Sequence, residues 1–321
     1  MSRTSIEWLC GARLKDCRTS GATMGTRYSA RFAVPKQVHV QTVIADLEAA
    51  VTTVDAQMSN WKADSDLSRL NRAAPDDWVP VPVNLASVLV RAAEIGRETG
   101  NAFNIGVGGL VDAWGFGPAG RNCSRGTSAA YPVCRPLDDL LEVDLPGCRV
   151  RKHAGVALDL CGIAKGFGVD ELARVLDRHG VGSWLVGIDG EMRARGCRPD
   201  GSPWAIALEA PDEDHREAMG VIELADAAIA TSGDYRQWRM IDGERVSHTM
   251  DPRTGAPLRV AVASVTVVAP TCTDADAYAT ALMVLGAEAG RDHAIRRGLD
   301  ALFVTRERNG LRRVGTGCFA T

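Results

Sequence analysis

Apolar residues recur along this chain at two spacings, and each spacing predicts one type of element. Between residues 38 and 58 they return every three or four positions, as on the buried face of a helix. The same spacing predicts helices over residues 85–99, 163–179, 273–285 and 294–297. Alternating or unbroken apolar runs predict strands over residues 28–34, 156–160, 183–192, 204–209, 221–224, 228–235, 260–269 and 299–305. The first half is thus rich in helices and the second in strands, which is typical of an α+β fold.

Capping residues suggest where two of the helices begin. Asp64 or Ser65 is a candidate N-cap for a short helix that ends near Asn71. Thr273 is the expected N-cap of the helix that ends at Gly286, with Asp276 at the third position in the manner of a capping box.

The first residues carry no periodic pattern. We expect residues 1–22 to form a flexible N-terminal leader and residues 23–321 to form a single domain. Glu7 interrupts the only apolar run near the start, so no signal peptide is predicted, and no later run is long enough to cross a membrane. These features predict a cytoplasmic protein.

Composition narrows the class of protein. The chain has 321 residues, of which 45% are hydrophobic and 24% charged, as in ordinary globular proteins. A net charge of -3 gives no general attraction to nucleic acid or to anionic membranes. The nine cysteines are scattered and form no C-x-x-C pair, so we expect free thiols rather than a disulfide framework or a zinc site.

One stretch, residues 157–170, has the character of an anion-binding site. A predicted strand turns at Cys161-Gly162 into a predicted helix, whose free N–H groups and dipole would point at one spot. Lys165 adds a positive charge in the first turn and Asp159 adds a carboxylate at the strand end, a pairing that suits a nucleotide. The pattern alone also fits a plain strand-to-helix connection with a surface lysine.

Several segments, taken in order, resemble the motifs of the ApbE family, the FAD:protein FMN transferases. The family patterns T-M-G-T, M-S-x-aromatic, S-E-L-S-x-L-N, F-D…W-G-F-G, D-L-G-G-I-A-K-G, S-G-D-Y, H-I-I-D-P-x-T-G and A-D-A-x-A-T-A-L correspond to residues 23–26, 58–61, 65–71, 103–117, 159–166, 232–235, 248–255 and 275–282. The resemblance covers nearly all of residues 23–305. It implies a single α+β domain of the ApbE type, with T-fold-like sheets flanked by helices.

The resemblance also implies a reaction. Family members cleave the pyrophosphate of FAD and move FMN onto a Ser or Thr hydroxyl of an acceptor flavoprotein, releasing AMP, with Mg²⁺ as the helper ion. The implied acceptor carries a motif like D-x-x-x-S/T-G-A-T. An FAD pyrophosphatase, in which water replaces the hydroxyl, and a flavin-binding module without turnover are the alternatives.

Site residues follow from the matched motifs. Asp276 and Thr280 are four residues apart on one helix face, and with a backbone carbonyl of Gly162, or else Ala164, they are the implied Mg²⁺ ligands. The implied FAD contacts are Met24, Trp61, Ala102, Phe103, Asn104, Asp159, Lys165 and Met250. His248 is the candidate base for the acceptor hydroxyl, and Asp251 is expected to orient it or to lie near the metal.

Four positions depart from the family pattern: Asn104 replaces Asp, Gly109 replaces Pro, Cys161 replaces Gly, and Asp189 lies where the family has only backbone. Asp189 would repel a diphosphate if it faced one and would be harmless if it faced outward. Residues 16–23 also resemble the acceptor motif, which raises self-flavinylation at Thr23. Against it, Thr23 belongs to the first motif of the fold, where its hydroxyl is expected to be packed.

Overall fold

The computed structural model describes residues 15–35, 38–118, 134–212, 215, 217–241, 243–259, 262–308 and 310–320. Its helices are α1 (Val40–Met58), α2 (Asp66–Arg72), α3 (Val83–Glu98), α4 (Gly108–Ala113), α5 (Ala164–Arg178), α6 (Cys272–Leu285) and α7 (Ala287–Arg297), with 3-10 turns η1 (Ile105–Val107), η3 (Leu137–Asp139) and η4 (Gly317–Phe319). Its strands are β1 (Lys15–Thr23), β2 (Thr26–Val34), β3 (Trp78–Pro80), β4 (Leu141–Asp144), β5 (Arg149–Lys152), β6 (Trp184–Ile188), β7 (Glu191–Arg195), β8 (Trp204–Glu209), β9 (Ala218–Leu224), β10 (Ala228–Gly233), β11 (Trp238–Ile241), β12 (Glu244–Ser247), β13 (Met250–Asp251), β14 (Ala256–Pro257), β15 (Val262–Ala269), β16 (Asp300–Glu307) and β17 (Gly310–Gly315).

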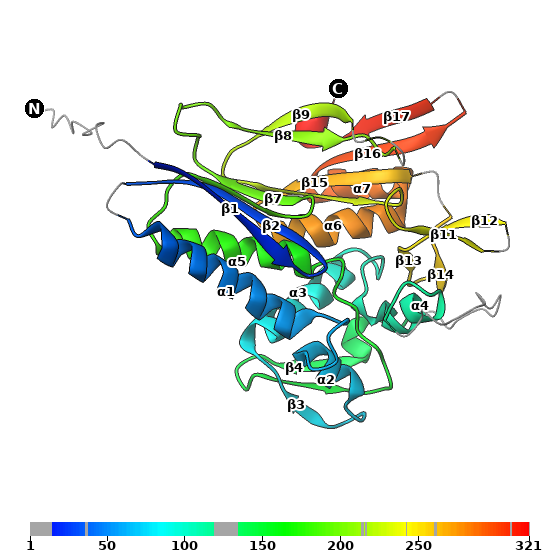
Figure 1. Ribbon diagram of the computed structural model, residues 1–321. Coiled ribbons are helices and arrows are strands. Elements are labelled where there is room, and N and C mark those ends of the chain that lie inside the picture. Colours follow the sequence, from blue (N-terminus) through cyan, green and yellow to red (C-terminus); the bar gives the residue numbers. More distant parts are fainter. Residues whose placement is uncertain are drawn as a thin grey trace, which may run out of the picture.

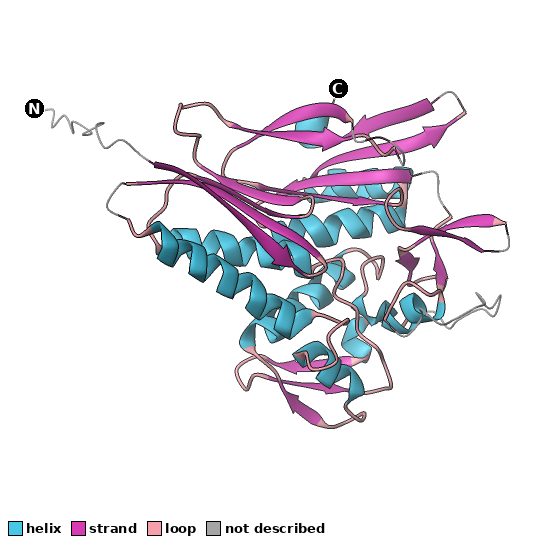
Figure 2. Cartoon of the chain, viewed as in Figure 1, coloured by secondary structure: helices cyan, strands magenta, loops and turns pink. Residues whose placement is uncertain are grey.

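An eight-stranded antiparallel sheet forms the upper layer of the fold, in the order β1-β2-β6-β7-β10-β15-β16-β17 (Figures 1 and 2). Helices α1, α5, α6 and α7 lie under one face of this sheet, and the β8–β9 hairpin lies over the other (Figure 1). Trp204 of β8 is 2% exposed and packs with Ala194 and Ile229 of the sheet. Both faces of the sheet are therefore covered near its middle.

Helices α5 and α6 run side by side and touch at their first turns. Gly166 permits this approach, because a Cβ at that position would lie 2.2 Å from the carbonyl oxygen of Cys272. The apolar face of α5, which includes the fully buried Val169, Leu172 and Leu176, packs under β2 and β6. Burial of each such side chain contributes roughly 1.5–3 kcal/mol.

The lower part of the molecule consists of α2, α3 and the small sheet β3-β5-β4 (Figure 1). Ser65 is the N-cap of α2, as predicted, and its hydroxyl accepts the Ser68 N–H at 3.0 Å. Leu67, Leu70 and Leu89 join this part to the apolar cluster that also contains Phe103 and Leu282. The chain folds as one α+β domain, as the sequence predicted.

The predicted leader is wrong for residues 15–22. They form most of β1, which pairs along its whole length with β2, so that Lys15 lies opposite Val34 and Thr23 opposite Thr26. In this edge strand only Cys17 and Thr23 are buried, so the apolar signal is weak. Residues 1–14 lie outside the described residues.

Three further predictions need correction. Residues 156–160 are extended but belong to no strand, because the Leu158 and Asp159 N–H groups bond to the side chain of Asn71 and to the carbonyl of Ile105. The predicted strand over residues 183–192 is a hairpin, β6 and β7, with its turn at Asp189-Gly190. Helix α6 begins earlier than predicted, with Thr271 rather than Thr273 as its N-cap.

The seven cysteines among the described residues are all free. Cys272 is buried, whereas Cys161 is exposed. Within the described ranges, no helix has both the length and the apolar character needed to span a membrane.

Candidate active site

The first turns of α5 and α6 bring the predicted metal-ligating residues together. Asp276 is 4% exposed, and its Oδ2 accepts the backbone N–H of Gly166 at 2.9 Å. A Cβ added to Gly162 would lie 3.1 Å from Thr280 Oγ1, so the corner before α5 faces the same side of α6. Thr280 Oγ1 is also 3.0 Å from the hydroxyl of Ser232 on β10.

This geometry leaves a backbone oxygen available at the corner. The Gly166 N–H donates to Asp276 rather than to the Gly162 carbonyl four residues earlier, and no backbone hydrogen bond to that carbonyl occurs among the described residues. The Ala164 carbonyl is the first of α5, where the helix's own hydrogen bonds use it. Gly162 is therefore the better of the two predicted carbonyl ligands.

The donor chemistry fits a hard divalent cation. Asp276, Thr280 and the Gly162 carbonyl offer a carboxylate, a hydroxyl and a carbonyl oxygen, the ligand types that Mg²⁺ prefers. Burial and the nearby Glu191 carboxylate raise the pKa of Asp276 to about 7. A cation beside it would offset this cost of burying charge. The described residues hold no cluster of three or more His, Cys, Asp or Glu side chains that would suit zinc.

Lys165 lies between two carboxylates of the β6–β7 hairpin. Its Nζ is 2.6 Å from Glu191 Oε1 and 3.7 Å from Asp189 Oδ2. Burial raises the pKa of Glu191, although the charge of Lys165 opposes this effect. Glu191 Oε2 is buried and has no hydrogen-bond partner among the described residues. Burial lowers the pKa of Lys165, but the carboxylates of Glu191, Asp276 and Asp189 outweigh burial and raise it, so the ammonium stays charged.

Asp159 stabilises the loop that leads into α5. Its Oδ1 accepts the Cys161 N–H at 2.7 Å, and its Oδ2 accepts the Asn60 side-chain amide at 2.8 Å. Trp61, next to Asn60 in the sequence, is 49% exposed, so much of its aromatic surface is accessible to solvent. The predicted pair of Asp159 and Lys165 thus lies on either side of the same corner.

His248 follows β12, and its ring orientation is determined by the backbone. Its Nδ1 is 3.0 Å from the carbonyl oxygen of Gln237. A carbonyl only accepts, so Nδ1 carries the proton and Nε2 holds the free lone pair. Burial lowers the pKa of His248 below 6.5, and the charges of Lys165 and Asp159 also act on it, which places the ring within the field of the α5 corner.

Asp251 does not orient His248 as predicted, because no hydrogen bond or ion pair joins these two residues. Asp251 is 7% exposed, and its two oxygens accept from Arg253 Nε and Nη2 at 2.9 Å each. Arg253 Nη2 also donates to the Val284 carbonyl on α6 at 3.0 Å. Asp251 therefore attaches the 251–255 turn to α6, and the Gln237 carbonyl orients His248 in its place.

Two of the predicted FAD contacts lie close to α5 and to the corner before it, and two others are buried. A Cβ at Gly168 of α5 would lie 3.0 Å from the Met24 side chain, and one at Gly162 would lie 3.3 Å from the Phe103 ring. Ala102 and Met250 are buried, at 1% and 5% exposed. Contacts of these residues with FAD remain predictions.

Asn104 is occupied within its own loop. Its amide donates to Asn101 Oδ1 and to the Arg135 carbonyl, at 2.7 and 2.9 Å, and its Oδ1 accepts the Gly106 N–H at 2.7 Å. An aspartate, which has no donor, could not make the first two bonds. The asparagine that replaces the family's aspartate therefore stabilises this loop. Contact of Asn104 with FAD stays a prediction.

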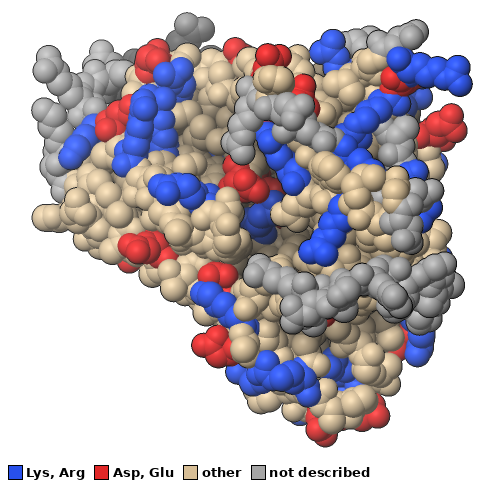
Figure 3. All heavy atoms as spheres, turned by 45° about the vertical axis from the view of Figure 1, so that its right-hand side comes forward, with Lys and Arg blue, Asp and Glu red and all other residues tan. Residues whose placement is uncertain are grey.

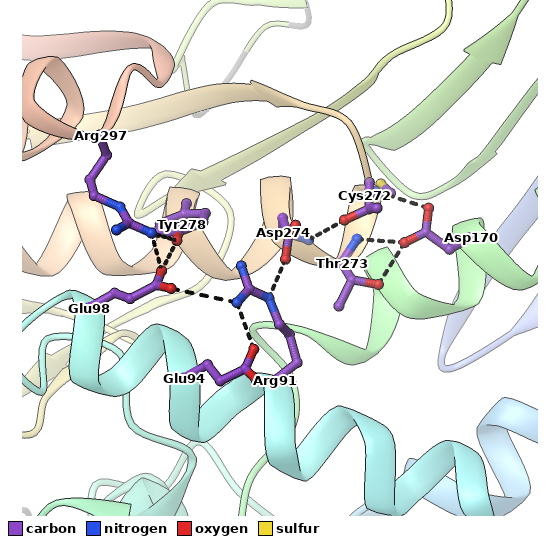
Figure 4. A network of polar contacts seen from close by, with 10 residues as sticks. Arg91, Glu94, Glu98, Asp170, Cys272, Thr273, Asp274, Tyr278 and Arg297 are labelled. Carbon is purple, nitrogen blue, oxygen red and sulfur yellow. Dashed lines mark hydrogen bonds and ion pairs between the residues drawn. The ribbon is translucent and has the colours of Figure 1, made fainter.

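Asp170 is a site residue that sequence reasoning missed. Its carboxylate accepts the Cys272 and Thr273 N–H groups at 3.0 and 2.9 Å, the Thr273 hydroxyl at 2.6 Å and Arg193 Nη1 at 2.7 Å. Figure 4 shows it facing the start of α6, where it caps the free N–H groups from a neighbouring helix. The available signal was an aspartate three residues after Phe167, on the apolar face of α5.

A second set of polar contacts ties α6 to α3. Arg91 Nε is 2.7 Å from Asp274 Oδ1, and Arg91 also pairs with Glu94 at 2.8 Å (Figure 4). Further along, the hydroxyl of Tyr278 on α6 donates to Glu98 of α3, which also pairs with Arg297 of α7 at 2.8 Å (Figure 4). Helix α6, which carries Asp276 and Thr280, is thus held from two sides.

Charges on the outer face are mixed. On the face shown in Figure 3, Lys and Arg side chains are spread widely and Asp and Glu side chains lie between them. This distribution agrees with the small net charge of -3. The chemistry of the site therefore rests on individual groups rather than on a broad field.

This chain is similar in sequence and in fold to proteins of one known family. A model of the ApbE family matches residues 24–303. The curated protein named FAD:protein FMN transferase from Vibrio cholerae is 35% identical over 97% of this chain and 93% of its own length, and the one from Haemophilus influenzae is 34% identical over 94% and 90%. The crystal structure of the flavinyl transferase ApbE from Pseudomonas stutzeri, in its apo form, superposes with a TM-score of 0.84 at 34% identity, covering 95% of this chain and 96% of that one.

Proposed function

The chain belongs to the ApbE family, and from this membership we propose that it transfers FMN from FAD to a Ser or Thr hydroxyl of an acceptor flavoprotein and releases AMP, with Mg²⁺ as helper ion. The observation that supports this most is the joined first turns of α5 and α6, where Asp276 binds the Gly166 N–H beside Lys165 and Thr280. This corner combines a helix N-terminus, a lysine and hard oxygen ligands, as a diphosphate substrate requires.

The excess of negative charge around this corner favours a metal ion as part of the site. Lys165 is the cation there, whereas Asp159, Asp189, Glu191 and Asp276 are acidic. A diphosphate would add more negative charge to a site that is already acidic. Mg²⁺, held by Asp276, Thr280 and the Gly162 carbonyl, would neutralise phosphate charge as a Lewis acid.

The transfer step needs a base for the acceptor hydroxyl and a positively charged group beside the phosphate. The acceptor oxygen forms a bond to the FMN phosphorus, the P–O bond to the bridging oxygen breaks, and AMP leaves with that oxygen. His248 Nε2 takes the hydroxyl proton, because Nδ1 already donates to Gln237 and the lowered pKa keeps the ring neutral. Lys165 stabilises the charge that develops on the phosphate oxygens.

The acceptor is proposed to carry a D-x-x-x-S/T-G-A-T-like segment. Residues 16–23 of this chain have a similar sequence, but they form β1, and Thr23 is 8% exposed at its end. A hydroxyl packed in this way is poorly placed for attack in a second copy. We therefore propose a separate protein as the acceptor rather than self-modification.

The test uses the purified protein with FAD, Mg²⁺ and a domain bearing the acceptor motif. The expected result is equimolar AMP and covalent flavin, seen as a fluorescent band after denaturing electrophoresis, with EDTA abolishing both. AMP and free FMN without covalent flavin would support a pyrophosphatase instead. FAD binding without AMP, even with the acceptor present, would overturn the enzyme assignment in favour of a binding module.

A further inference from the structure

The two carboxylates beside Lys165 differ in how firmly they are held. Glu191, 2.6 Å from Lys165 Nζ, has a side chain that is 3% exposed, whereas Asp189, 3.7 Å away, has a side chain that is 61% exposed. A buried carboxylate has little room to move and cannot exchange its partner for water. An exposed one can release the ammonium at small cost.

The backbone keeps Asp189 at the edge of the site. Its φ is +59° in the β6–β7 turn, and its N–H donates to the Arg27 carbonyl of β2 at 3.1 Å. Burial and Glu209 raise the pKa of Tyr235, in the turn after β10, and the Asp189 charge adds to this effect. The carboxylate thus faces the site from its rim, so this departure from the family pattern does not point away into solvent.

We propose that Asp189 is an affinity-setting residue, which competes with the diphosphate of FAD for Lys165 while Glu191 holds the same ammonium permanently. This role rests on the proposed use of FAD. When FAD is absent, Asp189 pairs with Lys165. When FAD is bound, the phosphate oxygens take its place and the carboxylate is left close to like charge, which weakens binding and favours release of AMP.

The competition predicts tighter binding when the charge is removed. Asp189→Asn keeps a residue that tolerates positive φ, so the turn is retained. The dissociation constant for FAD is expected to fall by roughly three- to tenfold at low ionic strength, given the energies of such partly exposed charge pairs. The gain should shrink at 0.5 M salt, because screening weakens the repulsion.

Binding is measured by quenching of flavin fluorescence in EDTA, where no turnover occurs, for the wild type and Asp189→Asn. Riboflavin, which lacks phosphate, serves as a second ligand and is expected to bind both proteins equally. Asp76→Asn is the matched control: Asp76 also has a positive φ, of +68°, and a side chain that is 74% exposed, but it lies beside His153 in the lower sheet.

The outcomes separate this role from the proposed function. If Asp189→Asn binds FAD no more tightly than the wild type, or gains equally for riboflavin, the affinity-setting role is wrong while FAD binding stands. If the wild type binds no FAD either with or without Mg²⁺, the proposed function itself fails. A gain that appears in Asp76→Asn as well would show a general charge effect and also overturn the role of Asp189.

Discussion

The Gly166 N–H on α5 donates to the Asp276 carboxylate on α6 at 2.9 Å. This bond joins two helices whose first turns are 110 residues apart in sequence. It also diverts the N–H from the Gly162 carbonyl, which no backbone N–H of the described residues occupies. One contact therefore both locks the helix pair together and leaves an oxygen ligand available at its corner.

Asp276→Asn should separate the structural and the chemical roles of this residue. Asparagine can still accept the Gly166 N–H, so we expect a thermal midpoint equal to or above that of the wild type, because a buried charge is removed. FAD cleavage should fall by about 100-fold or more, since a metal ligand is lost. Calorimetry and AMP chromatography measure the two effects, and Glu288→Gln, at the start of α7, is the control. Full activity in Asp276→Asn would rule out the metal-ligand role.

Activity should depend on pH through His248. The pKa of this ring is lowered below 6.5 by burial, so the neutral, basic form predominates above that pH. We therefore expect kcat/KM to be constant at neutral pH and to fall as the pH drops through the lowered pKa and the ring becomes protonated. His248→Ala should lower the rate and remove this acidic limb. If the acidic limb of the pH profile is unchanged in His248→Ala, the limb arises from the titration of another group.

Lys165 and Glu191 should behave as a coupled pair in stability. Lys165→Met leaves the Glu191 carboxylate buried without a cation, which should cost about 3–5 kcal/mol in the free energy of unfolding. The double variant Lys165→Met/Glu191→Gln should recover much of that loss, because neither side chain of the pair then carries a charge. Urea unfolding measures both. FAD cleavage should stay low in each, and additive losses in the double variant would contradict the pairing.

Asp170 should matter for the position of α6. Asp170→Ala leaves the Cys272 and Thr273 N–H groups and the Arg193 guanidinium without their common partner. We expect a loss of about 3–5 kcal/mol in stability. Hydrogen exchange in the first turn of α6 should also become faster. Asp177→Asn is the control on the same helix, since Asp177 is 42% exposed where it pairs with Arg195 and asparagine can still accept the Trp184 Nε1–H, so it should cost less than about 1 kcal/mol. Equal losses in both variants would remove any special role for Asp170.

Local sequence patterns predicted the helices well and the strands less well. The buried residues of α1 and α5 recur every three or four positions, so each helix is visible in its own sequence. Ser65 caps α2 by accepting the N–H of Ser68, three positions away. β1 was missed because an edge strand with few buried side chains carries little apolar signal. The β6–β7 turn was missed because the apolar run of β6 continues to Ile188, and this pattern does not show the left-handed backbone at Asp189.

The sequence by itself determined the family, the set of reactive side chains and the spacing of Asp276 and Thr280, because residue type and local period are readable from neighbouring positions. Only the tertiary structure decided the partners of these side chains. It paired Asp251 with Arg253, placed the Asn104 side chain within its loop and set Asp189 and Glu191 on either side of Lys165. The contacts of Lys165 with Asp189 and Glu191 depend on how α5 packs against the β6–β7 hairpin, and local spacing carries no information about that packing.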